Sequence, residues 1–167
     1  TYAYSKLLNI HKNAGNLKSL ITELLDFRKQ EQGLLKLKIS RFDLHALLME
    51  HYVLFKELAV NRNISFTLQT NCEQCFVWGD RLQIQKVINN LLSNAFKYTS
   101  DGGSIAIELT NGADECIFSV ADNGAGISEE DYQKIFERFY QVENIGQYGG
   151  TGIGLALSQG IVKAHQG

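Results

Sequence analysis

Residues 90–99, Asn90-Leu-Leu-Ser-Asn94-Ala-Phe-Lys97-Tyr-Thr99, are the stretch on which the fold and the chemistry of this chain depend. Asn90 and Asn94 are four residues apart and Lys97 is three further, so in a helix all three side chains project from one face. Amide oxygens are hard ligands that suit Mg²⁺, which shares the phosphates of its nucleotide, and an ammonium group neutralises remaining charge. Taken alone, such a set is more often simply solvated, so both interpretations stay open.

Apolar residues around this stretch extend the predicted helix towards the N-terminus. Its apolar face consists of Val87, Ile88, Leu91, Leu92 and Ala95. Asp80 is a plausible N-cap, and Trp78 closes a short strand just before it. The glycines at 102 and 103 indicate that the helix ends near residues 100–103. Further upstream, residues 64–68 alternate apolar and polar side chains, which predicts another strand.

A second helix and a further strand are predicted before residue 64. Residues 35–39 alternate strictly, as in a strand with one buried face, and Asp43 is a plausible N-cap for the helix that follows. The apolar stripe of that helix consists of Leu44, Leu47, Leu48, Leu54, Phe55 and Leu58.

The opening segment differs from the rest of the chain. Apolar residues recur there at alternating spacings of three and four, which is the seam of a helix packed against other helices. The seam consists of Leu7, Ile10, Ala14, Leu17, Ile21 and Leu24. Gly33 is suited to the C-cap. We therefore expect a bundle helix over residues 1–33 and a separate domain over residues 34–167.

The C-terminal half predicts a hairpin followed by two helices. Residues 105–109 and 117–121 alternate on either side of an Asn-Gly turn. Residues 128–136 begin with an approximate capping box, so we expect a helix there. Residues 140–150 lack periodicity and predict a mobile loop, whereas residues 153–165 again have helical spacing. The set predicts an α+β fold, a two-layer α/β sandwich with helices on one face of the sheet.

Two glycine-containing loops allow backbone to approach a ligand closely. In Asp122-Asn-Gly-Ala-Gly-Ile127, the carboxylate at a strand end could accept a hydrogen bond from an adenine amino group and would repel the carbonyl oxygen of guanine, although Asp-Asn-Gly is also an ordinary turn. Residues 149–155 open the last helix, where free amides and the helix dipole suit phosphate. The spacing matches neither a P-loop nor a dinucleotide-binding turn, so both of those folds are disfavoured.

Charge and composition exclude several classes of partner. The 16 Lys and Arg residues against 18 Asp and Glu give a formal net charge of −2, so the chain lacks the basic surface that nucleic acids require. No apolar run approaches the roughly 20 residues of a membrane helix, so we expect no membrane contact by this part. Cys72 and Cys75 have no second Cys or His pair that completes a zinc site, and we interpret them as loop thiols.

Together and in this order, the motifs resemble the ATP-binding catalytic domain of sensor histidine kinases, within the superfamily of gyrase, heat-shock chaperones, kinases and MutL. Residues 90–99 resemble its N box, residues 122–127 its G1 box, residues 136–140 its F box and residues 150–155 its G2 box. The likeness runs from about Asp80 to the C-terminus, and Phe-Glu-Arg-Phe separates kinases from the other branches. It implies the Bergerat fold, with a mixed, mainly antiparallel sheet.

The resemblance also implies roles for single residues. Asn94 would be the principal Mg²⁺ ligand with Asn90 beside it, and Lys97 would contact phosphate, which makes Asn94 and Lys97 the catalytic residues. Tyr98 would lie along the nucleotide and Asp122 would recognise adenine. Further ATP contacts are implied at Gly124, Gly126, Ile127, Gly150, Thr151, Gly152, Ile153, Gly154 and Leu155. The glycines would let a lid over residues 140–150 open and close, although Gln141 replaces a residue that is often basic in relatives.

Residues 1–33 resemble the second helix of the dimerisation and histidine-phosphotransfer domain, and residues 24–28 are typical of some hybrid sensors. The helix that carries the phosphoacceptor histidine is absent, and His11 is interpreted as a surface residue. The chain also ends before the family's third glycine box and closing strands, so we expect part of the sheet to be missing.

The function implied by the resemblance is transfer of the ATP γ-phosphoryl group to a histidine on the dimerisation domain, for phosphorelay to a response regulator receiver domain. The full protein would be a homodimer through its dimerisation helices, and this part would be the cytoplasmic portion of a membrane-anchored sensor. Without the acceptor, the chain is not expected to autophosphorylate. Two alternatives stay open: a nucleotide-gated binding module such as an anti-sigma serine kinase, and a scaffold that keeps the fold without turnover.

Overall fold

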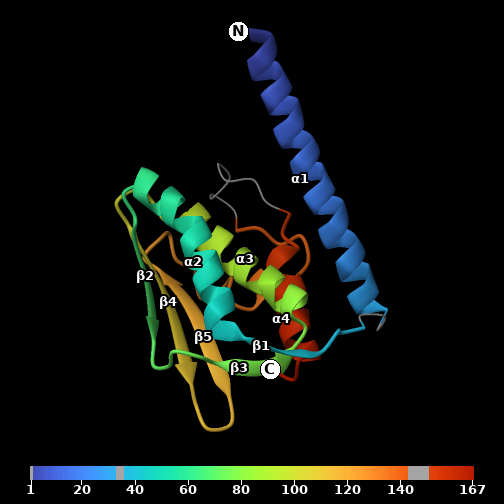
Figure 1. The fold of residues 1–167 in the computed structure, drawn as a ribbon. Coiled ribbons are helices and arrows are strands. Elements are labelled where there is room, and N and C mark those ends of the chain that lie inside the picture. The colour runs from blue at the N-terminus through green and yellow to red at the C-terminus, as the bar shows by residue number, and fades with distance from the viewer. Residues whose placement is uncertain (1, 33–35, 143–150) are drawn as a thin grey trace.

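The computed structural model describes residues 2–32, 36–142 and 151–167. Its helices and strands form two layers (Figure 1). The elements in chain order are α1 (Tyr2–Glu31), β1 (Ser40–Asp43), α2 (Leu44–Asn61), β2 (Ser65–Thr70), β3 (Phe76–Gly79), α3 (Arg81–Tyr98), β4 (Ser104–Asn111), β5 (Cys116–Asp122), the 3₁₀ helix η1 (Lys134–Phe136) and α4 (Gly154–Ala164). Figure 1 shows α2, α3 and α4 on one side of β2, β4 and β5, while α1 extends beyond the rest. The predicted two-layer α+β fold is confirmed.

The larger sheet has the strand order β2-β4-β5, with β2 parallel to β4 and β4 antiparallel to β5. The hairpin predicted from the Asn-Gly turn is present, with Ile105 opposite Asp122 and Asn111 opposite Cys116. A second, two-stranded sheet pairs β1 with β3 in antiparallel fashion. The mixed sheet therefore agrees with the expected class, and its parallel pair arises because α3 and β3 separate β2 from β4 along the chain.

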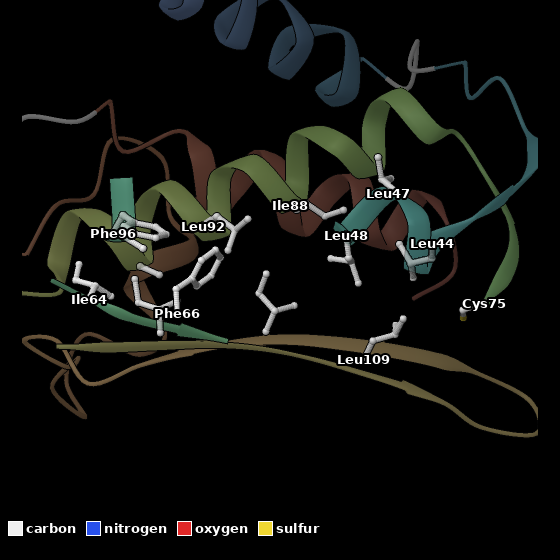
Figure 2. Packing of buried hydrophobic residues seen from close by; sticks show 14 residues of the cluster. Leu44, Leu47, Leu48, Ile64, Phe66, Cys75, Ile88, Leu92, Phe96 and Leu109 are labelled. Carbon is white, nitrogen blue, oxygen red and sulfur yellow. The ribbon is translucent and has the colours of Figure 1, made fainter. Parts of the chain in front are cut away.

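The hydrophobic core lies between the helices and the larger sheet, as Figure 2 shows. The period of the helix brings Ile88 and Leu92 to the inner face of α3, and strand alternation brings Ile107 and Leu109 of β4 to meet them. Each of these four side chains is at most 1% exposed. Complete burial of one such side chain contributes about 1.5–3 kcal/mol. The core thus fixes α3 on the sheet and leaves its opposite face for other contacts.

A smaller cluster attaches α4 to α3. It consists of Val87, Ile153, Leu157 and Ile161. All four are buried: Ile153, Leu157 and Ile161 recur every four residues along one face of α4, and Val87 contacts them from α3. The cluster extends along α4, and the contact between Gly154 and Asn90 shows that the beginning of α4 lies against the middle of α3.

Both predicted N-caps are confirmed. The Asp43 carboxylate accepts a hydrogen bond from His45 N–H at 3.0 Å, and Asp80 accepts from the N–H groups of Leu82 and Gln83 at 3.1 and 3.2 Å. Asp80 is 5% exposed and also accepts from Lys38 N–H at 2.8 Å. A buried carboxylate needs such donors, so Asp80 joins the start of α3 to the chain before β1.

Two predicted elements are wrong. Residues 36–39 are not a strand, because the segment that pairs with β3 is the next one, with Ser40 opposite Gly79. Residues 128–136 form turns and then η1 in place of a helix. There Ser128 Oγ donates to the Asp131 carboxylate at 2.6 Å, and this bond between side chains replaces the backbone bonds of a capping box. Gly33 and residue 35 lie outside the described residues.

Two further expectations are modified and one is confirmed. Leu54 and Leu58 were expected on the buried stripe of α2, but they are 70% and 41% exposed. Cys75 is not a loop thiol, since it is buried in the core and joined to Cys116, whereas Cys72 is free. His11 is exposed, as expected. Within residues 2–32, 36–142 and 151–167, no helix is long and apolar enough to span a membrane.

Candidate functional site

The polar face of α3 brings together the residues singled out in the sequence. Asn90, Asn94, Lys97 and Tyr98 are all half-buried on this helix. At about 1.5 Å per residue, they cover a length of roughly 12 Å. The opposite face of the same helix is in the core, so the polar face has a fixed direction. The site therefore extends along α3 from Asn90 to its C-terminus.

The loop after β5 packs against the C-terminal end of α3. Ala125 N–H donates to the Tyr98 carbonyl at 3.3 Å, and Asp122 Oδ1 accepts from Gly124 N–H at 2.9 Å. Asn123 Oδ1 accepts from Ser104 N–H at 2.7 Å, which holds the loop to the start of β4. Asp122 itself is exposed. These contacts place its carboxylate at the Tyr98 end of the site.

The Gly124→Ala variant is expected to displace this loop. A Cβ atom at residue 124 would lie 2.4 Å from the Tyr98 carbonyl oxygen, which is backbone and cannot rotate away. Overpacking of this kind costs about 1–3 kcal/mol, or roughly 2–12 °C in melting temperature for a chain of this length. Thermal unfolding and ATP titration measure the two effects, and both stability and affinity should fall.

Gly126→Ala is the matched control for this prediction. Gly126 has φ +70°, but nothing lies within 4 Å of a Cβ atom there, so only backbone strain of about 1–2 kcal/mol is added. If Gly124→Ala melts at the wild-type temperature, the close approach of residue 124 to the Tyr98 carbonyl is refuted.

The other end of the site is formed by α3 and the beginning of α4. The Asn90 amide lies against Gly154, where a Cβ atom would be 2.2 Å from Asn90 Oδ1. Asn90 Nδ2 donates to Ser158 Oγ at 2.9 Å. Gly154 is the first residue of α4, whose first amide groups have no acceptor within the helix. This end therefore combines amide oxygen with backbone donors that suit an anion.

A cavity of about 390 Å³ opens at the Asn90 end. Its lining comes from all four helices and consists of Thr22, Phe55, Lys86, Asn89, Asn90, Ser93, Gly154, Leu157, Ser158 and Ile161. The polar groups of the described residues that line it are amides, hydroxyls and the Lys86 ammonium group. Such a lining suits a phosphate group, and its amide oxygens are ligands for the Mg²⁺ that a nucleotide carries.

Lys97 lies beside Tyr98 at the opposite end. Its Nζ atom donates to Tyr98 Oη at 2.9 Å and lies 4.6 Å from the centre of the Tyr98 ring. An ammonium group over an aromatic face is attracted by the ring quadrupole. Lys97 is half-buried, so a phosphate group that reached it would find a positive charge already held in place.

The F box is attached to the G2 box just before α4. Phe139 N–H donates to Gly152 O at 2.9 Å, and Gly152 has φ +66° with the Phe139 backbone 2.6 Å from where a Cβ atom would lie. Tyr140 Oη donates to Asp131 Oδ1 at 2.5 Å. The hydrogen bonds from Ser128 and Tyr140 lower the pKa of Asp131 below its ordinary value. The F box is thus held next to the opening of α4.

The remaining predicted contacts differ in how much of each residue is exposed. Ile153 is 6% exposed inside the α3–α4 cluster, so it could offer only its backbone to a nucleotide. Leu155 is half-buried, Ile127 is exposed, and Thr151 Oγ1 accepts from Ile153 N–H at 3.2 Å. Gly150 and residues 143–149 of the expected lid lie outside the described residues.

Two residues that support the site were not predicted. Ser158 contacts Asn90 from α4, and its one signal in the sequence is a polar side chain between the apolar residues of that helix. Arg62 contacts carbonyl groups at the C-terminal end of α3, although it lies 34 to 37 positions before them in the chain. No local pattern could have indicated that contact.

The family model for histidine kinase-, DNA gyrase B- and HSP90-like ATPases matches residues 79–167. The chain is 37% identical to histidine kinase P4 of Formosa agariphila, over 98% of this chain and 12% of that protein. It is 33% identical to sensor histidine kinase RppB of Synechocystis, over 96% of this chain and 36% of that protein. The chain therefore spans well under half the length of these relatives.

Solved structures of histidine kinases are also similar to this chain. The catalytic domain of histidine kinase ThkA is similar with a TM-score of 0.70 at 34% identity, covering 77% of this chain and 83% of that one. ThkA in complex with the response regulator protein TrrA has a TM-score of 0.66 at 31% identity, covering 79% and 38%. Full-length ShkA in complex with AMPPNP has a TM-score of 0.77 at 25% identity, covering 89% and 31%.

The matched region contains α3, the loop after β5 and α4, which carry the motifs found in the sequence. The chain belongs to the family of histidine kinase-, DNA gyrase B- and HSP90-like ATPases, as the ATP-binding catalytic domain of a sensor histidine kinase.

Proposed function

We propose that this domain, within its full-length protein, transfers the γ-phosphoryl group of ATP to a histidine side chain of a dimerisation domain. The observation that carries the proposal is the single polar face of α3, which has the Asp122 loop at one end and the beginning of α4 at the other. A nucleotide with adenine at Asp122 would place its phosphates towards Lys97, Asn94 and Asn90. Asp122 and the polar face of α3 thus offer base recognition and charge neutralisation in one line.

The donor set fits Mg²⁺. Among the described residues, no three His, Cys, Asp or Glu side chains gather as a metal site. Mg²⁺ commonly keeps several waters and shares nucleotide phosphates, so it needs few protein ligands, and amide oxygens are hard enough to serve. Asn94 and Asn90 would hold the ion, which when bound neutralises phosphate charge.

The chain's own residues would do the rest. The Lys97 ammonium would stabilise charge on the transferring phosphoryl group, and the free amides at the beginning of α4 would orient the phosphates. Asp122 would accept a hydrogen bond from the adenine amino group. Lys97 and Tyr98 already contact each other, so the ammonium group and the ring lie together at this end of the site. The acceptor histidine would come from a domain outside this chain, so the chain alone should not form phosphohistidine.

The exposed seam of α1 supports a further part of the proposal. Leu7, Ile10 and Leu17 are 63%, 63% and 59% exposed. A row of exposed apolar side chains on one helix face is typical of a surface that binds another protein element. We propose that residues 1–33 are the second helix of a dimerisation bundle, that the full protein is a homodimer and that a receiver domain takes up the phosphoryl group. Light scattering of a chain with both bundle helices tests the dimer, and a persistent monomer would favour the anti-sigma type of module.

The proposed place of the domain in the cell is the cytoplasmic side of a membrane-anchored sensor. Fractionation of cells that contain the full protein tests this part, since recovery outside the membrane fraction would contradict it.

Calorimetric titration of ATP into the chain, with and without Mg²⁺, tests the binding site. We expect binding that is strengthened by Mg²⁺ and rejects GTP. Asp122→Ala should weaken ATP binding about tenfold or more, because a hydrogen bond to a charged group contributes about 1.5–3 kcal/mol. The same variant should also narrow the difference between ATP and GTP.

Exposed Asp114, in the turn between β4 and β5, provides the matched control. Asp114→Ala should bind ATP as the wild type does. Equal affinity of the wild type for ATP and GTP would refute base recognition by Asp122. Binding without transfer to an added acceptor domain would favour the scaffold.

A further inference from the structure

We propose that Ser158 is a positioning residue at the phosphate end of the site. Ser158 holds the Asn90 side chain so that the amide oxygen of Asn90 is available to Mg²⁺. This inference rests on the proposed function. Ser158 lies outside the four sequence motifs and is not among the contacts that they predict. Ser158 lies on α4, 68 residues after Asn90.

Ser158 is buried where an apolar side chain would otherwise pack. It is 7% exposed, and two nearby residues of α4, Leu157 and Ile161, belong to the apolar α3–α4 cluster. A hydroxyl group in such a place costs free energy unless it is hydrogen-bonded. Its partner is Asn90 Nδ2, at 2.9 Å. The contact therefore joins a buried group of α4 to a residue of the candidate site.

The two groups around Asn90 favour one orientation of its amide. Nδ2 donates to Ser158 Oγ, and Oδ1 lies against Gly154, the first residue of α4. The first amides of a helix are donors without an acceptor in the helix, so an oxygen is favoured beside them and an amino group is not. A flipped amide would place two donors there. Since an amino group cannot ligate Mg²⁺, only the observed orientation offers a ligand atom.

A cavity gives a ligand access to this contact. Asn90, Gly154 and Ser158 all line the cavity of about 390 Å³ at this end of the site. Because Ser158 Oγ occupies the Nδ2 side, the Asn90 oxygen is left towards the beginning of α4, where phosphates are favoured. Ser158 thus acts on the ion through Asn90, as partners of metal ligands commonly do.

The Mg²⁺ dependence of nucleotide binding tests the proposal. AMPPNP is titrated into the chain in EDTA and at increasing Mg²⁺. Loss of a partner of a metal ligand typically costs 10–100-fold in metal affinity, so Ser158→Ala should raise the Mg²⁺ concentration for half-maximal binding about tenfold. Affinity in EDTA should stay within about twofold, because the nucleotide's own contacts are intact. Ser158→Thr keeps the hydroxyl group and should restore Mg²⁺ dependence.

A second comparison separates positioning from general packing. In an Asn90→Ala background, Ser158→Ala should have no further effect on Mg²⁺ dependence, because the residue through which it acts is gone. Should Ser158→Ala lose cooperative unfolding, Ser158→Cys, which keeps the volume with a weaker acceptor, provides the same comparison.

Three results would overturn the inference: wild-type Mg²⁺ dependence in Ser158→Ala, equal losses with and without Mg²⁺, or additive losses in the Asn90→Ala background. If the wild type shows no effect of Mg²⁺ at all, the proposed function fails first. If the wild type responds to Mg²⁺ and Ser158→Ala responds equally, only the role of Ser158 fails.

Discussion

Replacing Asn94 with alanine is expected to lower the rate of phosphoryl transfer to an added acceptor domain about 100-fold or more. Asn94 is half-buried on the polar face of α3, one turn from Asn90 and one turn from Lys97. Removing one preorganised group that stabilises transition-state charge typically costs about 10²–10³ in rate. Transfer of labelled phosphate from ATP at saturating Mg²⁺ measures the effect.

The expected loss also has a signature in binding. Asn94→Ala should bind ATP in EDTA about as well as the wild type does, but should gain little when Mg²⁺ is added. Asn94→Asp keeps an oxygen ligand and should retain part of the Mg²⁺ effect. Asn61→Ala, a change of the same kind at the exposed end of α2, is the control and should transfer phosphate normally. A normal rate in Asn94→Ala would remove Asn94 from the mechanism.

The Arg62→Ala variant is expected to have the largest effect on stability. The Arg62 guanidinium donates from Nη2 to Thr99 O at 2.7 Å, from Nε to Asp101 Oδ1 at 2.7 Å, and from Nη1 to Phe96 O. Two of these acceptors are carbonyls at the end of α3, where no helical donor remains and a positive charge is favoured.

Without Arg62 these carbonyls lose a charged donor. Hydrogen bonds to charged groups contribute about 1.5–3 kcal/mol, so we expect a loss of about 2–3 kcal/mol and a fall of roughly 4–12 °C in melting temperature. Because Tyr98 O holds the Asp122 loop, ATP affinity should fall as well. Thermal unfolding and ATP titration measure the two effects.

Arg81→Ala is the matched control for Arg62→Ala. Arg81 Nη2 lies 2.6 Å from Glu50 Oε2, but both side chains are substantially exposed, at 39% and 56%. Such surface pairs contribute about 0–1 kcal/mol. Equal melting temperatures of the two variants would show that the contacts of Arg62 with the end of α3 add nothing beyond a surface ion pair.

Much of the fold and of the candidate site could be predicted because the signals are local. The caps at Asp43 and Asp80, the hairpin at the Asn-Gly turn and the polar face of α3 all follow from residues within a few positions of each other. The strand expected at residues 35–39 was wrong because alternation shows that a segment can pair, but the partner strand selects which residues do. The helix expected at 128–136 was wrong because Ser128 and Tyr140 both bond the Asp131 carboxylate.

By itself, the sequence determined the class of the fold, the order of the motifs and the face of α3 from which Asn90, Asn94 and Lys97 project, since helix geometry fixes those directions within one element. Only the tertiary structure decided what surrounds that face. Ser158 reaches Asn90 across 68 residues, and Arg62 reaches Thr99 across 37. The physical reason is that hydrogen bonds between elements depend on how the buried clusters seat one helix on another, and no spacing along the chain records that arrangement.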